Sequence, residues 1–229
     1  MKLVHPDFLC QIELPEDRIP VLILENPSRF CQFVADLQRQ IAGEEGDWVL
    51  SDSGKPLKID KFCELILDPF SLDINQRKMI TALYAQIEKE VLQTEMLLEW
   101  NQISTSLELA AVKLMSVLDD YELIYRDEIN IRDFLKFMDV HFDVRAEELP
   151  ERLIDYMRMS VDVLGTRLFI LCNIKSFIDE QNMQYIYEQA LYNKFHLLLV
   201  ENHESEQINE LERRIVIDKD DCLITRNDV

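Results

Sequence analysis

The feature that most constrains the fold is an apolar run that passes directly into an amphipathic helix within residues 18–41. The run Val21-Leu22-Ile23-Leu24 contains no polar residue, which is typical of a strand buried on both faces of a parallel sheet. Asn26 is a favourable helix N-cap, and Pro27 suits the first helical position, where a missing N–H costs nothing. The apolar residues that follow recur at helical spacing: Phe30, Phe33, Val34, Leu37 and Ile41. We therefore predict a strand, a tight turn and a helix.

The turn between this strand and this helix lacks the residues that hold a nucleotide phosphate. Strand–turn–helix units that bind nucleotides carry a glycine-rich loop whose N–H groups surround the phosphates. Here the turn is Glu25-Asn26-Pro27-Ser28, with an acidic side chain and neither glycine nor lysine. The motif G-x-x-x-x-G-K-[ST] occurs nowhere in the chain. The expected architecture resembles a nucleotide-binding core, but we expect no nucleotide and no ATP hydrolysis.

The last part of the chain repeats the pattern of buried strands and helices. Leu168–Leu171 and Leu197–Val200 are further apolar runs, and Met183–Leu191 between them has helical periodicity. Strands that alternate with helices predict a mostly parallel sheet with right-handed crossovers. The predicted fold class is therefore α/β. Because sheet-forming segments stand at both ends of the chain, we predict a discontinuous α/β head of residues 1–70 and 165–229.

The middle of the chain, residues 71–164, is predicted to be an inserted α-helical leg. An apolar stripe with charges on the opposite face extends from Ile80 to Leu98. Thr105 and Glu108 have the spacing of a capping box, which predicts the start of a second helix there.

The chain is strongly acidic, with a formal net charge of −20 at pH 7. Nucleic-acid binding needs basic surface that neutralises phosphates, so the charge by itself argues against it. Any DNA contact requires a local basic rim, bound cations, or both. Five basic residues on the predicted leg form either a DNA-binding face or ordinary solvated surface: Arg77, Lys78, Arg126, Arg132 and Lys136.

An acidic connection in the leg is the candidate metal site. The segment DDYELIYRDE holds five carboxylates: Asp119, Asp120, Glu122, Asp127 and Glu128. Calcium takes several oxygen ligands in a flexible geometry, which such a segment can supply, although the spacing is not that of an EF-hand. The alternative is a solvated acidic turn in which Asp127 and Glu128 favour the N-terminus of the next helix.

No catalytic constellation is recognisable. The four histidines do not stand at zinc-ligand spacing, and no serine occupies a G-x-S-x-G elbow. The five cysteines are scattered without a C-x-x-C pair, which favours reduced thiols in a cytoplasmic protein. The start MKLVHPDFL is broken by Pro6 and Asp7 and does not resemble a signal peptide. No apolar run approaches the ~18 residues of a membrane span. We expect a cytoplasmic protein that is not an enzyme.

Four segments together resemble a known family: MKLVHP, PVLILENPSRFCQFVADL, YRDEINIRDFL and the ending CLITRNDV. Their order, with a sheet half, a helical insertion, a second sheet half and a closing LIT-[RK]-N-x-V, is similar to the small accessory adaptation protein of type II-A CRISPR systems. The resemblance extends over the whole chain and includes its length. No single motif carries it, because the family has no catalytic signature.

The resemblance implies an α/β head like that of P-loop ATPases without nucleotide binding, a helical leg, and no enzymatic activity. It implies a ring-shaped homotetramer that binds calcium and holds double-stranded DNA, preferably at free ends, during spacer acquisition. The implied protein partners are the CRISPR integrase proteins and the effector nuclease. A calcium requirement makes the acidic connection a stronger metal candidate, and four copies of one basic residue in a ring would contact phosphates together.

A second class of function stays open from the residues alone. The chain could be an interaction scaffold, with a degenerate ATPase-like head that docks other adaptation proteins and with DNA binding incidental. Charge reversal of the basic residues on the leg distinguishes the two classes, because it removes DNA binding only if the leg contacts DNA. A metal-dependent nuclease is a weaker third hypothesis, since the acidic connection lacks a nearby paired lysine.

Overall fold

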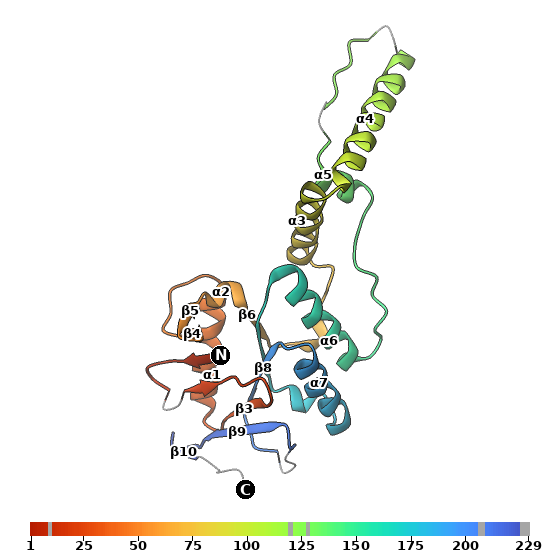
Figure 1. The fold of residues 1–229 in the computed structure, drawn as a ribbon. Coiled ribbons are helices and arrows are strands. Elements are labelled where there is room, and N and C mark those ends of the chain that lie inside the picture. Colours follow the sequence, from red (N-terminus) through yellow and green to blue (C-terminus); the bar gives the residue numbers. More distant parts are fainter. Residues whose placement is uncertain (9–10, 119–120, 127–128, 206–208, 225–229) are drawn as a thin grey trace. The chain divides into compact units, whose positions relative to one another are not determined.

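The computed structural model describes residues 1–229 except 9–10, 119–120, 127–128, 206–208 and 225–229 (Figure 1). The chain forms two compact units. The first, here the sheet unit, consists of residues 1–74 and 145–229, and the second, here the helical unit, consists of residues 75–144.

The sheet unit is built on a six-stranded sheet with the strand order β10-β9-β3-β8-β7-β6. The pairs from β9 to β6 are parallel, and β10 pairs with β9 in the antiparallel direction. The predicted α/β class with a mostly parallel sheet is therefore confirmed. The strands are β3 (Ile19–Leu24), β6 (Cys63–Ile66), β7 (Leu168–Cys172), β8 (His196–Glu201), β9 (Glu212–Ile217) and β10 (Leu223–Ile224).

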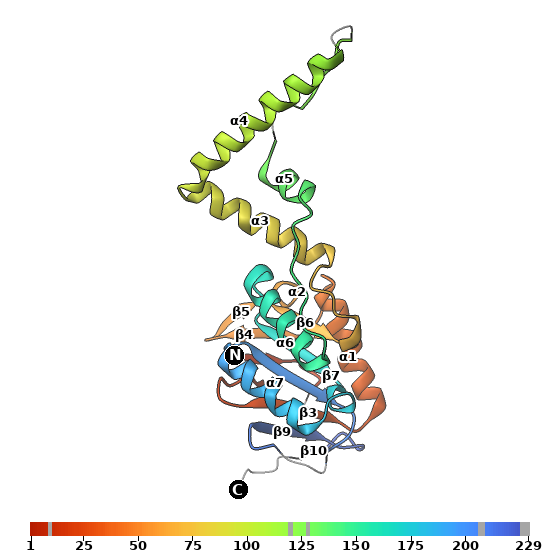
Figure 2. The same cartoon turned by 90° about the vertical axis from the view of Figure 1, so that its right-hand side faces the viewer.

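Strand β3 and helix α1 (Pro27–Ile41) form the predicted strand–turn–helix unit. The Asn26 side chain caps the helix by accepting a hydrogen bond from the Ser28 N–H at 3.0 Å, and Pro27 is the first helical residue. Every residue of β3 is buried because helices cover both faces of the sheet. Helix α1 lies on one face, and α6 (Leu149–Met159) and α7 (Glu180–Tyr192) lie on the other (Figure 2).

Helix α1 also packs against a second, smaller sheet. This four-stranded antiparallel sheet has the order β2-β1-β4-β5. Leu3 and Leu50 from its strands share one buried core cluster with Phe33 and Leu37 of α1 and with Leu22 of β3. The α1 helix is therefore buried against both sheets. The strands of the smaller sheet are β1 (Lys2–Val4), β2 (Ile12–Glu13), β4 (Val49–Asp52) and β5 (Lys55–Leu57).

The N-cap of α1 allows a direct test of the turn between β3 and α1. Replacing Asn26 by alanine removes the acceptor for the Ser28 N–H and also the donor to the Lys219 carbonyl, and we expect the free energy of unfolding to fall by at least about 1 kcal/mol. Urea denaturation measures the change. The control is Ser28→Ala, which keeps the backbone N–H and should change stability by less than about 0.5 kcal/mol. Equal stability of the Asn26→Ala variant and the parent protein would show that the cap contributes nothing.

The predicted end of the helical insertion at residue 164 differs from the boundary between the units. Helix α6 and the π-helical turn that follows it belong to the sheet unit. Leu153 and Met157 are fully buried, and the Tyr156 hydroxyl donates a hydrogen bond to Glu64 on β6. An amphipathic helix has the same sequence pattern whether its apolar face packs on a sheet or on another helix, so periodicity could not assign α6. The other short elements here are α2 (Ile59–Phe62), η1 (Pro69–Ser71), η3 (Ser160–Leu164) and η4 (Ile174–Ser176).

The helical unit contains two long helices that meet at Thr94. They are α3 (Arg77–Gln93) and α4 (Met96–Met115), followed by the turn η2 (Ser116–Leu118) and the short helix α5 (Ile131–Phe137). The helix start predicted at Thr105 is wrong, because the Thr105 hydroxyl donates to the Asn101 carbonyl at 2.8 Å inside α4. In the described part of the chain, no helix has both the length and the apolar character needed to cross a membrane.

Candidate nucleic-acid interface and a buried charge cluster

All five basic residues predicted to bind DNA lie in the helical unit, and all are solvent-exposed. Arg77 and Lys78 are in the first turn of α3, and Arg132 and Lys136 are on α5. Arg126 precedes α5. They do not act as one group. Some are paired with carboxylates, and others line a cavity.

Two of the five are engaged in ion pairs within the unit. Arg126 Nη1 lies 2.5 Å from Asp133 Oδ2, and Arg132 Nε lies 2.7 Å from Glu88 Oε2. The second pair joins α5 to α3. Because each guanidinium already faces a carboxylate, these two arginines offer less net positive charge to a phosphate than their number suggests.

Two others are brought together by the fold. Arg77 and Lys136, 59 positions apart in the sequence, both line a cavity of about 700 Å³ between α3 and the chain that follows α5. Lys78 neighbours Arg77 in the sequence but is not among the residues that line this cavity. The structure thus gives Arg77 and Lys136 a shared environment.

The predicted calcium site falls mostly outside the described residues. Asp119, Asp120, Asp127 and Glu128 are not described, and Glu122 is exposed. Within the described ranges, no group of three or more His, Cys, Asp or Glu side chains could hold a metal ion. Calcium at the acidic connection therefore stays a prediction.

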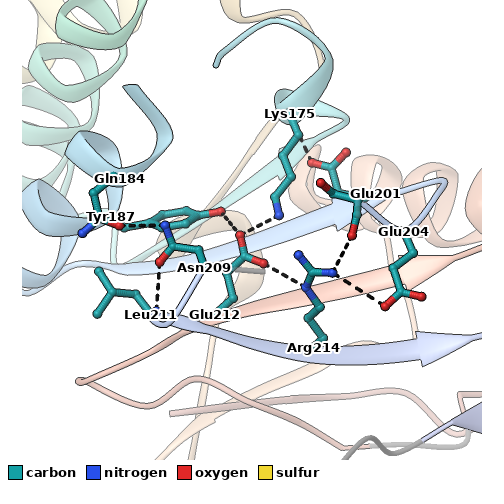
Figure 3. Close-up of polar contacts among 10 residues, drawn as sticks. Lys175, Gln184, Tyr187, Glu201, Glu204, Asn209, Leu211, Glu212 and Arg214 are labelled. Atoms are coloured by element: carbon teal, nitrogen blue, oxygen red, sulfur yellow. Dashed lines mark hydrogen bonds and ion pairs between the residues drawn. The ribbon is translucent and has the colours of Figure 1, made fainter. Parts of the chain in front are cut away.

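The structure reveals a buried charge cluster on the α7 side of the main sheet, which sequence analysis missed (Figure 3). Its centre is Glu212 on β9, whose side chain is almost fully buried. The Glu212 carboxylate lies 2.5 Å from Lys175 Nζ, accepts a hydrogen bond from the Tyr187 hydroxyl at 2.8 Å, and lies 3.0 Å from Arg214 Nε. Two cations and a hydroxyl therefore compensate the burial of this carboxylate.

Arg214 extends the cluster to the connection between β8 and β9. Its Nη1 donates to the Ser205 carbonyl at 2.8 Å and lies 3.6 Å from Glu204 Oε1. The sequence contains one weak indication that Glu212 and Arg214 form a pair. In a strand, residues two apart share a face, so Glu212 and Arg214 in ERRIVI had to lie side by side.

Glu201, at the end of β8, is the least compensated carboxylate of this region. It is 2% exposed, and its Oε1 accepts a hydrogen bond from the Lys175 N–H at 3.4 Å. Among the described residues, its Oε2 has no hydrogen-bond partner. Burial is the main cause that raises the pKa of Glu201 from its ordinary value of 4.5 to about 7, against the opposing effect of Lys175. Near neutral pH this carboxyl group is consequently divided between its protonated and ionised forms.

The turn after β3, where a phosphate-binding loop would stand in a nucleotide-binding protein, contacts residues near the C-terminus. Asn26 Nδ2 donates to the Lys219 carbonyl at 3.3 Å, and Arg29 Nε lies 3.2 Å from Asp221 Oδ1. This turn is thus tied to the segment between β9 and β10.

A comparison with protein-family models identifies the family of this chain. The family model described as CRISPR-associated protein (Cas_Csn2) matches residues 40–221, a range that includes the whole helical unit and strands β6 to β9. The protein thus falls in the class of CRISPR-associated proteins. It belongs to the Csn2 family, the accessory adaptation proteins of type II-A CRISPR systems.

The other comparisons add little. No curated protein sequence matches the chain. One similar solved structure is described as "Putative ABC transporter (ATP-binding protein)" from Pyrococcus furiosus, with 11% identity and a TM-score of 0.39 over 93% of this chain and 97% of that chain. A similarity of this size supports no conclusion about the present protein.

Proposed function

We propose that this protein binds the ends of double-stranded DNA, without sequence preference and without catalysis, as a calcium-dependent homotetrameric ring in CRISPR spacer acquisition. The proposal combines membership of the Csn2 family with one feature of the structure, the unburied apolar surface of α4. Calcium at the acidic connection, the DNA contacts and the protein partners named above, the integrase proteins and the effector nuclease, are parts of this proposal.

The apolar surface of α4 supports assembly. The helix has no buried residue, even though many of its side chains are apolar. Leu109 is 58% exposed and Leu114 is 74% exposed, and several other apolar side chains of the helix are exposed as well. Large apolar side chains exposed along a whole helix are unfavourable in water, because a helix gains most of its stability from burying an apolar face. A second copy of the chain would cover this surface.

The charge of the chain explains why cations would be needed. At −20 per chain, four subunits would repel one another and DNA, and bound calcium would offset part of that repulsion. Basic residues repeated by symmetry would then contact phosphates without reading bases, which predicts binding that weakens steeply with salt.

Sedimentation velocity with and without a calcium chelator, repeated with a fluorescent linear duplex, tests the proposal. We expect a tetramer that carries DNA only with calcium, and no binding when both duplex ends are blocked. Changing Leu109 and Leu114 to glutamine should weaken assembly at least about tenfold, because each removes exposed apolar area from the interface. Tyr192→Gln, on an exposed aromatic residue of the sheet unit, is the control. A monomer that ignores calcium and DNA would refute the proposal.

The interaction scaffold is the second candidate, and the same helix favours it. If α4 docks another adaptation protein instead of a second copy, the Leu109 and Leu114 changes should abolish that contact while the free chain stays monomeric. DNA binding would then be unaffected by charge changes in the helical unit.

A further inference from the structure

The cavity that Arg77 and Lys136 share lies entirely within the helical unit and has two well-defined walls. One wall is a single face of α3, on which Arg77, Thr81 and Tyr84 are spaced by one helical turn. The other wall is formed by the end of α5 and the chain that follows, with Lys136, Val140 and His141.

The second wall is held by the side chains of Tyr84 on α3 and of Asn75 just before α3. The Asn75 amide donates to the Phe142 carbonyl at 3.0 Å and accepts from the Phe142 N–H at 2.9 Å. The Tyr84 hydroxyl donates to the Val140 carbonyl at 2.8 Å. These bonds attach the irregular segment on both sides of His141, at Val140 to α3 and at Phe142 to Asn75 just before α3, so the backbone of this wall is held in place.

The charges in the cavity favour an anion. In the described part of the chain, neither Arg77 nor Lys136 pairs with a carboxylate, in contrast to Arg126 and Arg132. The one acidic lining residue is Asp139, whose carboxylate lies 3.8 Å from His141 Nδ1 and is largely exposed. His141 Nδ1 also lies 2.6 Å from the Asp139 carbonyl oxygen, which accepts a hydrogen bond from the ring N–H.

We propose that this cavity binds a phosphate ester through Arg77 and Lys136. The arginine fork matches two phosphate oxygens and the lysine supplies a compact positive charge. A volume of about 700 Å³ accommodates the group attached to the phosphate as well, against the apolar surfaces of Ile80, Tyr84 and Val140. The phosphate is that of a DNA strand, in which case the inference rests on the proposed function, or that of a free nucleotide.

The experiment compares variants matched in charge. Arg77→Gln/Lys136→Gln removes both cations from the cavity, and Lys89→Gln/Lys113→Gln removes two exposed lysines elsewhere in the same unit. The probes are an internally labelled duplex with a 5′-phosphate, the same duplex with a 5′-hydroxyl, and free deoxyadenosine monophosphate. Anisotropy measures duplex binding and isothermal titration measures nucleotide binding. Thermal melting verifies that both variants fold.

We expect the cavity variant to weaken phosphate binding at least about tenfold and to reduce the salt slope of duplex binding by about 1 for each lost contact. The control should lose less than about twofold, because exposed lysines away from the ligand act only through screened long-range attraction. Asp139→Asn should strengthen binding about threefold by removing the opposing charge. Asparagine tolerates the positive φ of 51° at this position, so the wall is preserved.

The probes identify the source of the phosphate. Preference for the 5′-phosphorylated duplex indicates a terminal phosphate, and equal binding of both duplexes, with equal loss in the cavity variant, indicates backbone phosphates. Binding of the nucleotide without the duplex supports the cavity and refutes the proposed function. If the cavity variant and the control lose duplex binding equally, the cavity is refuted and the proposed function stands. Absence of binding to every probe refutes both.

Discussion

Replacing Arg214 by methionine is expected to lower the free energy of unfolding by about 3–5 kcal/mol, the usual cost of removing one partner from a buried ion pair. The Arg214 side chain is only 7% exposed, and its guanidinium contacts Glu212, Glu204 and the Ser205 carbonyl. Methionine fills much of the same volume, so the loss comes from leaving buried carboxylates undercompensated. Urea denaturation at about neutral pH measures the change.

The adjacent residue is the matched control. Arg213 is on the same strand but on its opposite face, where it lies 2.9 Å from Glu13 and is 45% exposed. Arg213→Met removes the same charge and the same shape, yet it should cost less than about 1 kcal/mol, because an exposed ion pair is hydrated before and after folding. Equal losses for the two variants would mean that burial of the cluster does not govern its energetics.

Glu201 is expected to make the protein less stable as the pH rises. Its pKa of about 7 in the folded protein lies above its ordinary value of 4.5, so the folded state binds this proton more tightly than the unfolded state. The group therefore favours folding at low pH. That contribution is lost as the pH rises from about 4.5 to about 7, and above this range the ionised carboxylate carries the full desolvation cost.

The variant Glu201→Gln isolates this effect, because glutamine does not titrate and all other groups are shared. Between about pH 5 and about pH 8, the stability of the variant relative to the parent should increase by about 2–3 kcal/mol. Urea midpoints at both pH values measure it. A constant difference between the two proteins would show that Glu201 keeps an ordinary pKa in the folded state.

The parts of the fold that sequence patterns predicted well are those in which local signals coincide. At the β3–α1 junction, the apolar run, the Asn26 cap and Pro27 all specify the same structure, and each acts between residues that are neighbours in the chain. The buried strands β7 and β8 followed from the same kind of apolar run. The break between α3 and α4 at Thr94 was not predicted, because the apolar stripe continues across it from Ile80 to Leu98. The capping-box spacing at Thr105 indicated a helix start at the wrong place, inside the continuous helix α4.

The candidate site was predictable only in part. Clustering along the chain placed Arg77 and Lys136 on the helical insertion, and the structure has both in the helical unit. It could not reveal that Arg126 and Arg132 face Asp133 and Glu88, since ion pairing depends on which helix faces are adjacent. Nor could it reveal that Asn75 and Tyr84 hold the opposite wall of the cavity.

The amino-acid sequence by itself determined the class of sheet, the strand–helix junction at its centre, the helical insertion and the family, because these depend on periodicity, local capping and the order of segments. The tertiary structure alone decided that α6 packs on the sheet, that Glu212 is buried among Lys175, Tyr187 and Arg214, and that Arg77 and Lys136 share one cavity. The physical reason is the same in each case. These features arise from contacts between residues far apart in the chain, and burial, not residue type, sets their energies.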